Sequence, residues 1–170
     1  MHKLFSYQYQ KYVYELFIGD YIATQEKDVL LSTVLGPCIA VCLADELSGV
    51  IGMNHFMLPG RSEEGDSRYG LDSTERLIED MLEKGAELHR LKAKVFGGAT
   101  LFKIGNKSVA DSNVSCITDY LSHRNIPVEA TDIGRDCGRR VFYCSTTYSV
   151  YLKRFAKIDA PGQLNAATYK

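Results

Sequence analysis

Two apolar runs separated by a short turn constrain the fold of this chain more than any other feature. Residues 39–43 and 50–57 are rich in β-branched side chains, and the segment ADELSG lies between them at 44–49. This pattern predicts two neighbouring strands joined as an antiparallel hairpin. Because the two runs carry almost no charge, both strands are expected to lie in the core.

The rest of the chain shows two helical patterns set among strand patterns. A helix is predicted from Asp72, which can cap it, to Gly85, and a second one over 111–123. Strands are predicted at 91–96 and 126–134, and a closing hairpin at 139–155. This order predicts an α+β domain over 18–158, with the helices on one face of a sheet. Residues 1–17 are interpreted as an aromatic lead-in, either a short helix or an arm, and 159–170 as a frayed tail.

The composition of the chain argues against nucleic acid and membranes as binding partners. The 170 residues carry a formal net charge of −1, which gives no field to attract nucleic acid or anionic lipid. No apolar run approaches the roughly 20 residues that a membrane span needs, so membrane insertion is not expected. The polar, tyrosine-rich first 17 residues do not resemble a signal peptide, and a cytoplasmic location is therefore expected.

The cysteines do not form a pattern typical of disulfides or of zinc. An odd count, five, and the absence of a C-x-x-C motif argue against a disulfide framework. No second close Cys/His pair completes a zinc site, and no metal or cofactor is expected. Most of the five are interpreted as small buried residues, namely Cys42, Cys116 and Cys144.

Cys38 is different, because the predicted hairpin brings it close to His55. A regular hairpin centred between Glu46 and Leu47 pairs position 38 with position 55, and directly opposed Cβ atoms lie about 4.5–5.5 Å apart. Pro37 marks a strand beginning, so Cys38 is expected at an accessible strand mouth. A thiol beside an imidazole can form a reactive thiolate–imidazolium pair. The alternative, that both residues simply fill the core, stays open.

Such a histidine needs a third group to orient its ring. Ser32 and Thr33, on the segment that leads to Cys38, are the candidates.

Several motifs together resemble the CheD family of chemoreceptor glutamine deamidases. The stretch STVLGPCIAVCLADELSGVIGMNHFMLPG, residues 32–60, is similar to the family's signature. The segment AKVFGGA at 93–99 resembles a second signature, and residues 105–143 are similar to the helix and strands that close the family's domain. The resemblance covers roughly residues 17–155.

The resemblance implies a fold and an activity. The fold is a three-layer α/β/β sandwich, similar to the cytotoxic necrotizing factor deamidase domains. The activity is hydrolysis of glutamine side-chain amides to glutamate in chemotaxis receptors. Carried over by position, Cys38 takes the place of the nucleophile and His55 that of the general base. Ser32 falls where the family usually has the threonine that orients the histidine.

One departure from the family pattern bears on activity. Pro37 stands where the family usually has serine, and proline has no N–H to offer an oxyanion, although the N–H of Cys38 remains. Two alternatives therefore accompany the deamidase hypothesis. One is a binding module for a CheC-type phosphatase of the response regulator CheY, with weak catalysis. The other is a thiol amidohydrolase that acts on a different protein.

Overall fold

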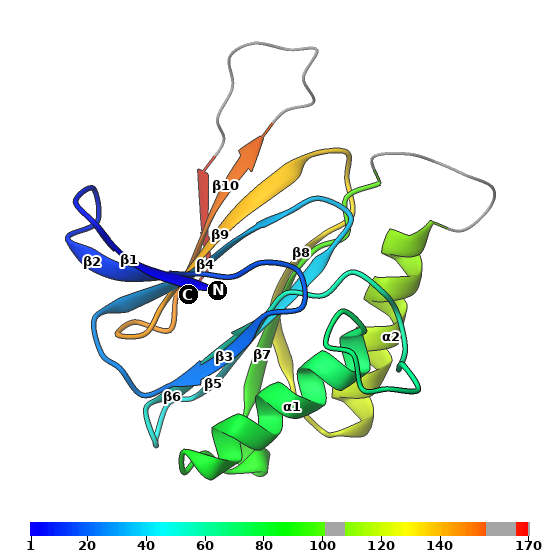
Figure 1. Cartoon of the computed structure of the whole chain (residues 1–170), viewed down its shortest axis with the longest axis horizontal. Coiled ribbons are helices and arrows are strands. Elements are labelled where there is room, and N and C mark those ends of the chain that lie inside the picture. The colour runs from blue at the N-terminus through cyan, green and yellow to red at the C-terminus, as the bar shows by residue number, and fades with distance from the viewer. Residues whose placement is uncertain (101–107, 156–165, 170) are drawn as a thin grey trace.

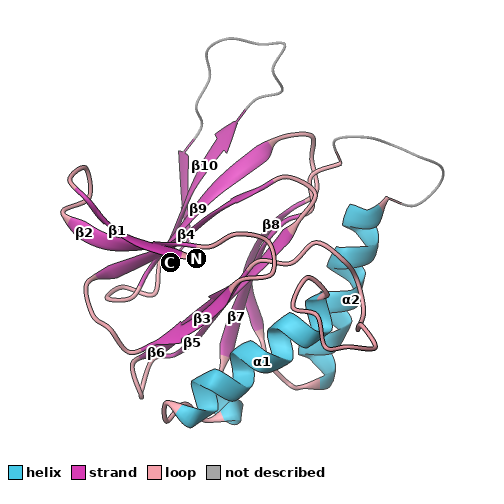
Figure 2. Cartoon of the chain, viewed as in Figure 1, coloured by secondary structure: helices cyan, strands magenta, loops and turns pink. Residues whose placement is uncertain are grey.

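The computed structural model describes residues 1–100, 108–155 and 166–169, which form two stacked sheets and two helices (Figure 1). Helices α1 (Gly70–Glu83) and α2 (Val109–His123) cover one face of the five-stranded sheet, and the six-stranded sheet lies against its other face (Figure 2). The three-layer α/β/β sandwich and the α+β class are therefore confirmed. Neither of these two helices is long and apolar enough to cross a membrane.

The six-stranded sheet, sheet A, contains both ends of the described chain. Its strands lie in the order β1 (His2–Ser6), β2 (Lys11–Glu15), β4 (Val29–Leu35), β9 (Gly138–Cys144), β10 (Val150–Phe155) and β11 (Ala166–Tyr169). The first 17 residues thus contain a β-hairpin, where a helix or an arm was expected. Residues 166–169 pair with β10, so the expectation of a frayed tail is wrong for them.

The five-stranded sheet, sheet B, lies in the middle layer. Its strands lie in the order β3 (Tyr21–Thr24), β6 (Val50–Asn54), β5 (Ile39–Asp45), β7 (Lys92–Gly97) and β8 (Val128–Ile133). A short 3₁₀ helix, Leu88–Arg90, precedes β7.

Alternation along the central strand β5 explains why sheet B packs on both faces. Every residue of β5 is buried, as expected for a strand covered on both sides. Ile39, Val41 and Leu43 pack into the core beneath the helices. Ala40, Cys42 and Ala44 point the other way, into the core between the two sheets.

The predicted β5–β6 hairpin is present, but its register differs by two residues from the prediction. Asp45 pairs with Val50 and Cys42 with Met53, which centres the turn between Leu47 and Ser48. The carboxylate of Asp45 accepts hydrogen bonds from the N–H groups of Leu47 and Ser48, and Gly49 adopts a left-handed conformation with φ 72°. These contacts close a four-residue turn, and a shift of two leaves each side chain on its predicted face.

The helices begin slightly earlier than predicted. Helix α1 has Tyr69 at its N-cap position without a side-chain cap, and Asp72 instead accepts a hydrogen bond from the backbone N–H of Ser62. Asp72 therefore fixes the loop before the helix and does not cap it. Helix α2 begins with a capping box made by Ser108 and Asp111.

Candidate active site

Cys38 lies in the short connection between β4 and β5, at the end of the sandwich where the chain passes from sheet A to sheet B. Its side chain packs in the core between the sheets and is 6% exposed. Its carbonyl accepts a hydrogen bond of 2.8 Å from Gly98, and the carbonyl of Gly36 accepts one of 2.8 Å from Ala99. These two main-chain bonds attach the connection that contains Cys38 to the loop after β7.

Gly97 allows this close approach. Its φ is 114°, a backbone conformation that residues other than glycine rarely adopt. A Cβ atom at this position would collide with the carbonyl oxygen of Cys38. The two glycines at 97–98 therefore let the β7 loop pack against the backbone of Cys38.

His55 follows β6 and is fixed by the turn formed by residues 16–20. Its N–H donates to the carbonyl of Asp20 at 2.9 Å, and its own carbonyl accepts from Gly19 at 2.7 Å. Ile39 and Phe56 form a pair with two hydrogen bonds of 3.0 Å, which places Cys38 diagonally across from His55. Diagonal neighbours on one face of an antiparallel pair lie about 7–8 Å apart, within reach of an imidazole.

A threonine hydroxyl orients the imidazole ring. Thr33 Oγ1 lies 2.7 Å from His55 Nδ1 and donates its own proton to the carbonyl of Leu16 at 2.8 Å. Since the hydroxyl has only one proton to give, it accepts from Nδ1, and the neutral ring carries its proton there. The lone pair then belongs to Nε2, which is buried and has no hydrogen-bond partner among the described residues.

The expected role of Ser32 is corrected by this contact. Successive residues of a strand point to opposite faces. Thr33 shares its face with Leu31 and Leu35, toward sheet B, whereas Ser32 lies on the outer side of sheet A with Leu30. Ser32 Oγ is buried without a described partner. Because apolar residues flank both Ser32 and Thr33 at alternate positions, the sequence offers no signal that separates them.

Paired substitutions test this assignment. Replacing Thr33 by Val removes the acceptor for Nδ1–H while conserving shape, and the hypothesis that His55 acts as a base predicts a loss of about 10- to 100-fold in the rate of reaction. Replacing Ser32 by Ala should leave the rate within about twofold, because its hydroxyl has no described partner. Steady-state kinetics of both variants provide the measurement, and equal losses would contradict the assignment.

Burial keeps both site residues neutral, contrary to the ion pair expected from the sequence. Burial raises the pKa of the Cys38 thiol above its ordinary value, although its own backbone N–H opposes the shift. Burial also lowers the pKa of His55 to about 4, more than the Leu16 carbonyl and the Asp20 carboxylate raise it. At rest, Cys38 is therefore a thiol and His55 a neutral imidazole, the protonation states that general-base activation of a thiol requires.

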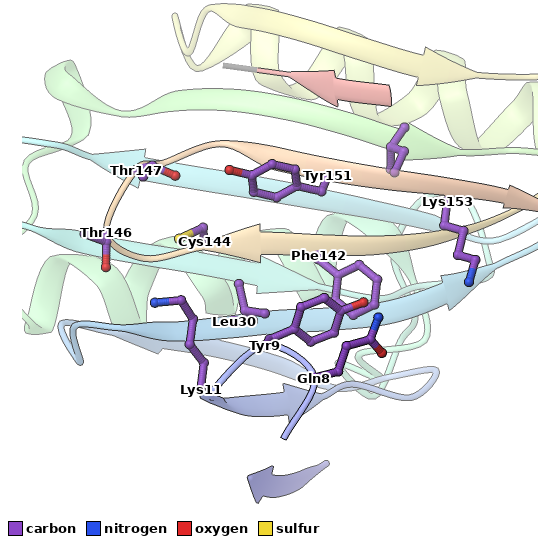
Figure 3. Close-up of a pocket in the computed structure, with 11 residues that line it drawn as sticks. Gln8, Tyr9, Lys11, Leu30, Phe142, Cys144, Thr146, Thr147, Tyr151 and Lys153 are labelled. Atoms are coloured by element: carbon purple, nitrogen blue, oxygen red, sulfur yellow. The ribbon is translucent and has the colours of Figure 1, made fainter. Parts of the chain in front are cut away.

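A cavity lies elsewhere, on the outer face of sheet A (Figure 3). It has a volume of about 560 Å³ and includes Cys144, a cysteine that is 6% exposed, like Cys38. Burial raises the pKa of Cys144, but hydrogen bonds from Thr147 and Thr146 and the charge of Lys11 outweigh it and lower the pKa overall. No histidine is among the described residues that line this cavity.

The two equally exposed cysteines should differ in their reactivity toward an alkylating agent. Because only the thiolate reacts, we expect iodoacetamide at pH 7.5 to modify Cys144 faster than Cys38 in the free protein. Peptide mapping by mass spectrometry after short exposures measures both rates. Faster modification of Cys38 would indicate that its thiol is already ionised at rest.

A buried ion pair supports the loops behind Cys38. Arg139 is fully buried in β9, and its Nε donates to Asp132 of β8 at 2.6 Å. The same guanidinium donates to the carbonyl of Gly134 at 2.7 Å, and Gly134 N–H donates to the carbonyl of Gly97 at 3.0 Å. The pair therefore connects sheet A and sheet B to the glycine loop beside Cys38, a role that sequence reasoning did not assign to Arg139.

Within the described ranges 1–100, 108–155 and 166–169, no cluster of three or more His, Cys, Asp or Glu side chains is placed to hold a metal ion.

Comparison with known proteins identifies the family. A family model described as CheD chemotactic sensory transduction matches residues 57–154. A Chromobacterium violaceum protein named probable chemoreceptor glutamine deamidase CheD 2 is 36% identical, over 94% of this chain and 82% of the relative. The chain belongs to the CheD family. A CheD protein of Caulobacter vibrioides, also named as a probable deamidase, is 39% identical over 88% of this chain and 82% of its own length.

Two solved structures overlap with part of this CheD-family chain. The hypothetical protein YfiH of Bacillus licheniformis has a TM-score of 0.45 and 11% identity, over 66% of this chain and 50% of its own. A Neisseria meningitidis protein has a TM-score of 0.41 and 10% identity, over 68% and 52%. At these scores the overlap has no bearing on function.

Proposed function

We propose that this chain hydrolyses glutamine side-chain amides in the cytoplasmic domains of chemotaxis receptors, with Cys38 as nucleophile and His55 as base. The names of its relatives, probable chemoreceptor glutamine deamidases, support the substrate. The observation that carries the mechanism is the hydrogen bond between Thr33 and His55. It leaves the Nε2 lone pair on the face of the sheet that also holds Cys38.

In the first half of the proposed reaction, His55 Nε2 takes the proton of the Cys38 thiol as sulfur attacks the glutamine Cδ. The N–H of Cys38 is the donor available to the tetrahedral oxyanion, since Pro37 offers none. The imidazolium then gives its proton to the amide nitrogen, the C–N bond breaks, and ammonia leaves a thioester on Cys38.

In the second half, Nε2 takes a proton from water while the water oxygen attacks the thioester carbonyl. The carbon–sulfur bond breaks, the glutamate carboxylic acid is released, and the imidazolium returns a proton to the Cys38 thiolate. The products are glutamate and ammonia, and the chain's own groups handle every proton.

Incubation with a receptor cytoplasmic fragment tests the proposal. Mass spectrometry should show a gain of roughly one dalton at particular glutamines, with release of ammonia in equal amount. A chain that binds the fragment or a CheC-type phosphatase and leaves every glutamine intact would favour the binding-module alternative. Deamidation of an unrelated protein in preference to the receptor would favour the other amidohydrolase.

The pH dependence of kcat/KM distinguishes a neutral Cys38–His55 pair from a thiolate–imidazolium ion pair. His55 accepts a proton only when it is neutral, and its pKa is lowered to about 4. We therefore expect kcat/KM to remain high as the pH falls from 8 to about 5 and to decline only as it approaches 4. Rates measured across this range on a receptor fragment give the profile. A decline centred near the ordinary histidine value of about 6.5 would contradict the assignment.

A further inference from the structure

The proposed reaction depends on the direction of one backbone N–H group, that of Cys38. Pro37 has no N–H, so the peptide bond between Pro37 and Cys38 carries the donor that remains for the oxyanion. A peptide unit is planar, and its direction is set by the peptide units on either side of it. The contacts of the residues around Pro37 therefore decide where this donor points.

The loop after β7 holds both of the neighbouring peptide units. On one side, the carbonyl of Gly36 accepts a hydrogen bond of 2.8 Å from Ala99. On the other side, the carbonyl of Cys38 accepts one of 2.8 Å from Gly98. Between them, the ring of Pro37 fixes its own φ. The direction of the Cys38 N–H is therefore set largely by the position of this loop.

A second loop, residues 134–137 between β8 and β9, holds the loop after β7 in turn. Gly134 N–H donates to the carbonyl of Gly97 at 3.0 Å, and Thr100 N–H donates to the carbonyl of Arg135 at 2.7 Å. Arg135 has a φ of 63°, a left-handed conformation that is uncommon for residues other than glycine. Such a backbone persists only where the surrounding contacts fix it, so the second loop needs support of its own.

The guanidinium of Arg139 provides this support. Its Nη2 donates to the carbonyl of Gly134 at 2.7 Å and its Nη1 to the carbonyl of Cys137 at 3.1 Å, so one side chain binds both ends of the second loop. Its Nε donates to Asp132 at 2.6 Å. The planar, rigid fork of a guanidinium permits these three bonds at once.

We propose that Arg139 is a positioning residue for the oxyanion donor, because its guanidinium fixes the two loops that orient the N–H of Cys38. This inference rests on the proposed function. Arg139 is fully buried, so it acts on the reaction only through these loops. Its loss should slow steps that pass through a tetrahedral oxyanion and spare reactions of the Cys38 sulfur that form none.

The variant Arg139→Met tests this role with two reagents that both react at Cys38. With p-nitrophenyl acetate, sulfur adds to the ester carbonyl, an oxyanion forms, and p-nitrophenol leaves an acetyl thioester. With iodoacetamide, sulfur displaces iodide directly and no oxyanion forms. We expect acetylation of Cys38 to slow by about 10- to 100-fold and alkylation to stay within about twofold of wild type. Peptide mapping by mass spectrometry after short exposures measures both rates.

Two further variants separate the position of the loops from the ion pair. Arg139→Lys keeps a cation for Asp132, but its compact ammonium lacks the fork that binds both loop carbonyls, so we expect the same selective loss. It also keeps the test available if Arg139→Met does not fold. Arg154→Met is the matched control, because Arg154 donates to Asp132 and Tyr169 and to neither loop among the described contacts. It should leave both rates within about twofold.

Several outcomes would overturn the role of Arg139. They are an equal loss of acetylation and alkylation in the Arg139 variants, unchanged acetylation in them, and an equal selective loss in Arg154→Met. A wild-type Cys38 that is alkylated but never acetylated would overturn it too, since no oxyanion donor would then be in place.

Deamidation of a receptor cytoplasmic fragment keeps this inference separate from the deamidase proposal. We expect kcat to fall in Arg139→Lys as acetylation does, with KM within about twofold of wild type. An unchanged kcat would overturn the role of Arg139 and leave the deamidase proposal standing. Acetylation of Cys38 that depends on Arg139, in a wild-type chain that leaves every glutamine intact, would support Arg139 and overturn the deamidase.

Discussion

Replacing Cys38 by Ala is expected to abolish deamidation of a receptor fragment, with a loss of at least about 1000-fold in kcat. The variant has no atom that can form the thioester, and a neutral His55 with its Nε2 lone pair cannot replace the missing sulfur. Release of ammonia and the mass of the product peptides provide the measurement.

A matched control for this substitution exists within the same chain. Cys144→Ala removes a thiol that is exposed to the same small extent but lies in the cavity on the outer face of sheet A. We expect it to retain full activity. Unfolding of Cys38→Ala close to that of wild type would show that chemistry was lost and not the fold. Full activity of Cys38→Ala would refute the nucleophile assignment.

The second large effect is expected at Asp132. This carboxylate accepts from Arg139, from Arg154, and from Tyr169 at 2.9 Å. Replacing it by Ala leaves the fully buried guanidinium of Arg139 without its carboxylate, and breaking a buried pair in this way costs roughly 3–5 kcal/mol of the free energy of unfolding. Urea unfolding monitored by circular dichroism measures the loss.

An exposed pair on the same strand provides the comparison for Asp132. Glu129 lies on β8 and pairs with Lys92 at 3.2 Å, and both side chains are well exposed. Glu129→Ala should cost no more than about 1 kcal/mol. A similar cost for both variants would show that the buried ion pair adds nothing beyond an exposed one.

The same carboxylate predicts how stability responds to acid. Burial raises the pKa of Asp132, but hydrogen bonds from Arg154, Arg139 and Tyr169 outweigh it and bring the pKa down to about 2. A depressed carboxyl pKa stabilises the folded state fully above the unfolded value near 4, and this stabilisation is lost as the pH falls from about 4 to about 2. Wild type should therefore lose more stability over this interval than Asp132→Ala.

Most of the fold could be predicted from the sequence, because periodicity and turn residues encode it locally. The β5–β6 hairpin, both helices, β7 and the β9–β10 hairpin all follow from such patterns. The register of the first hairpin could not be predicted, because the side-chain hydrogen bonds of Asp45 decide it. Strands β1 and β11 are the two edge strands of sheet A, and β2 joins the sheet through a parallel pairing with β4, so the local sequence of these strands is a weak guide.

The candidate site, like the fold, could be predicted from the sequence only in part. The alternation of side chains along the hairpin was enough to place Cys38 and His55 on one face, because a shift of two residues in register leaves each side chain on the same face. The choice between Ser32 and Thr33 required knowing which face of β4 meets sheet B. The neutral state of both residues depends on burial between two sheets, which comes from the stacking of the sheets and not from neighbours in sequence.

The hydrogen bond between His55 and Thr33 joins the end of a strand in one sheet to a strand of the other. The orientation of His55, the proposed base, therefore depends on the spacing between the two sheets, and the candidate site is not contained in any single loop or strand. Evolution or design cannot transplant this chemistry by grafting a short peptide. Substitution of small core residues such as Ala40 and Ala44, which face sheet A, changes the distance between the two sheets and can thereby adjust turnover.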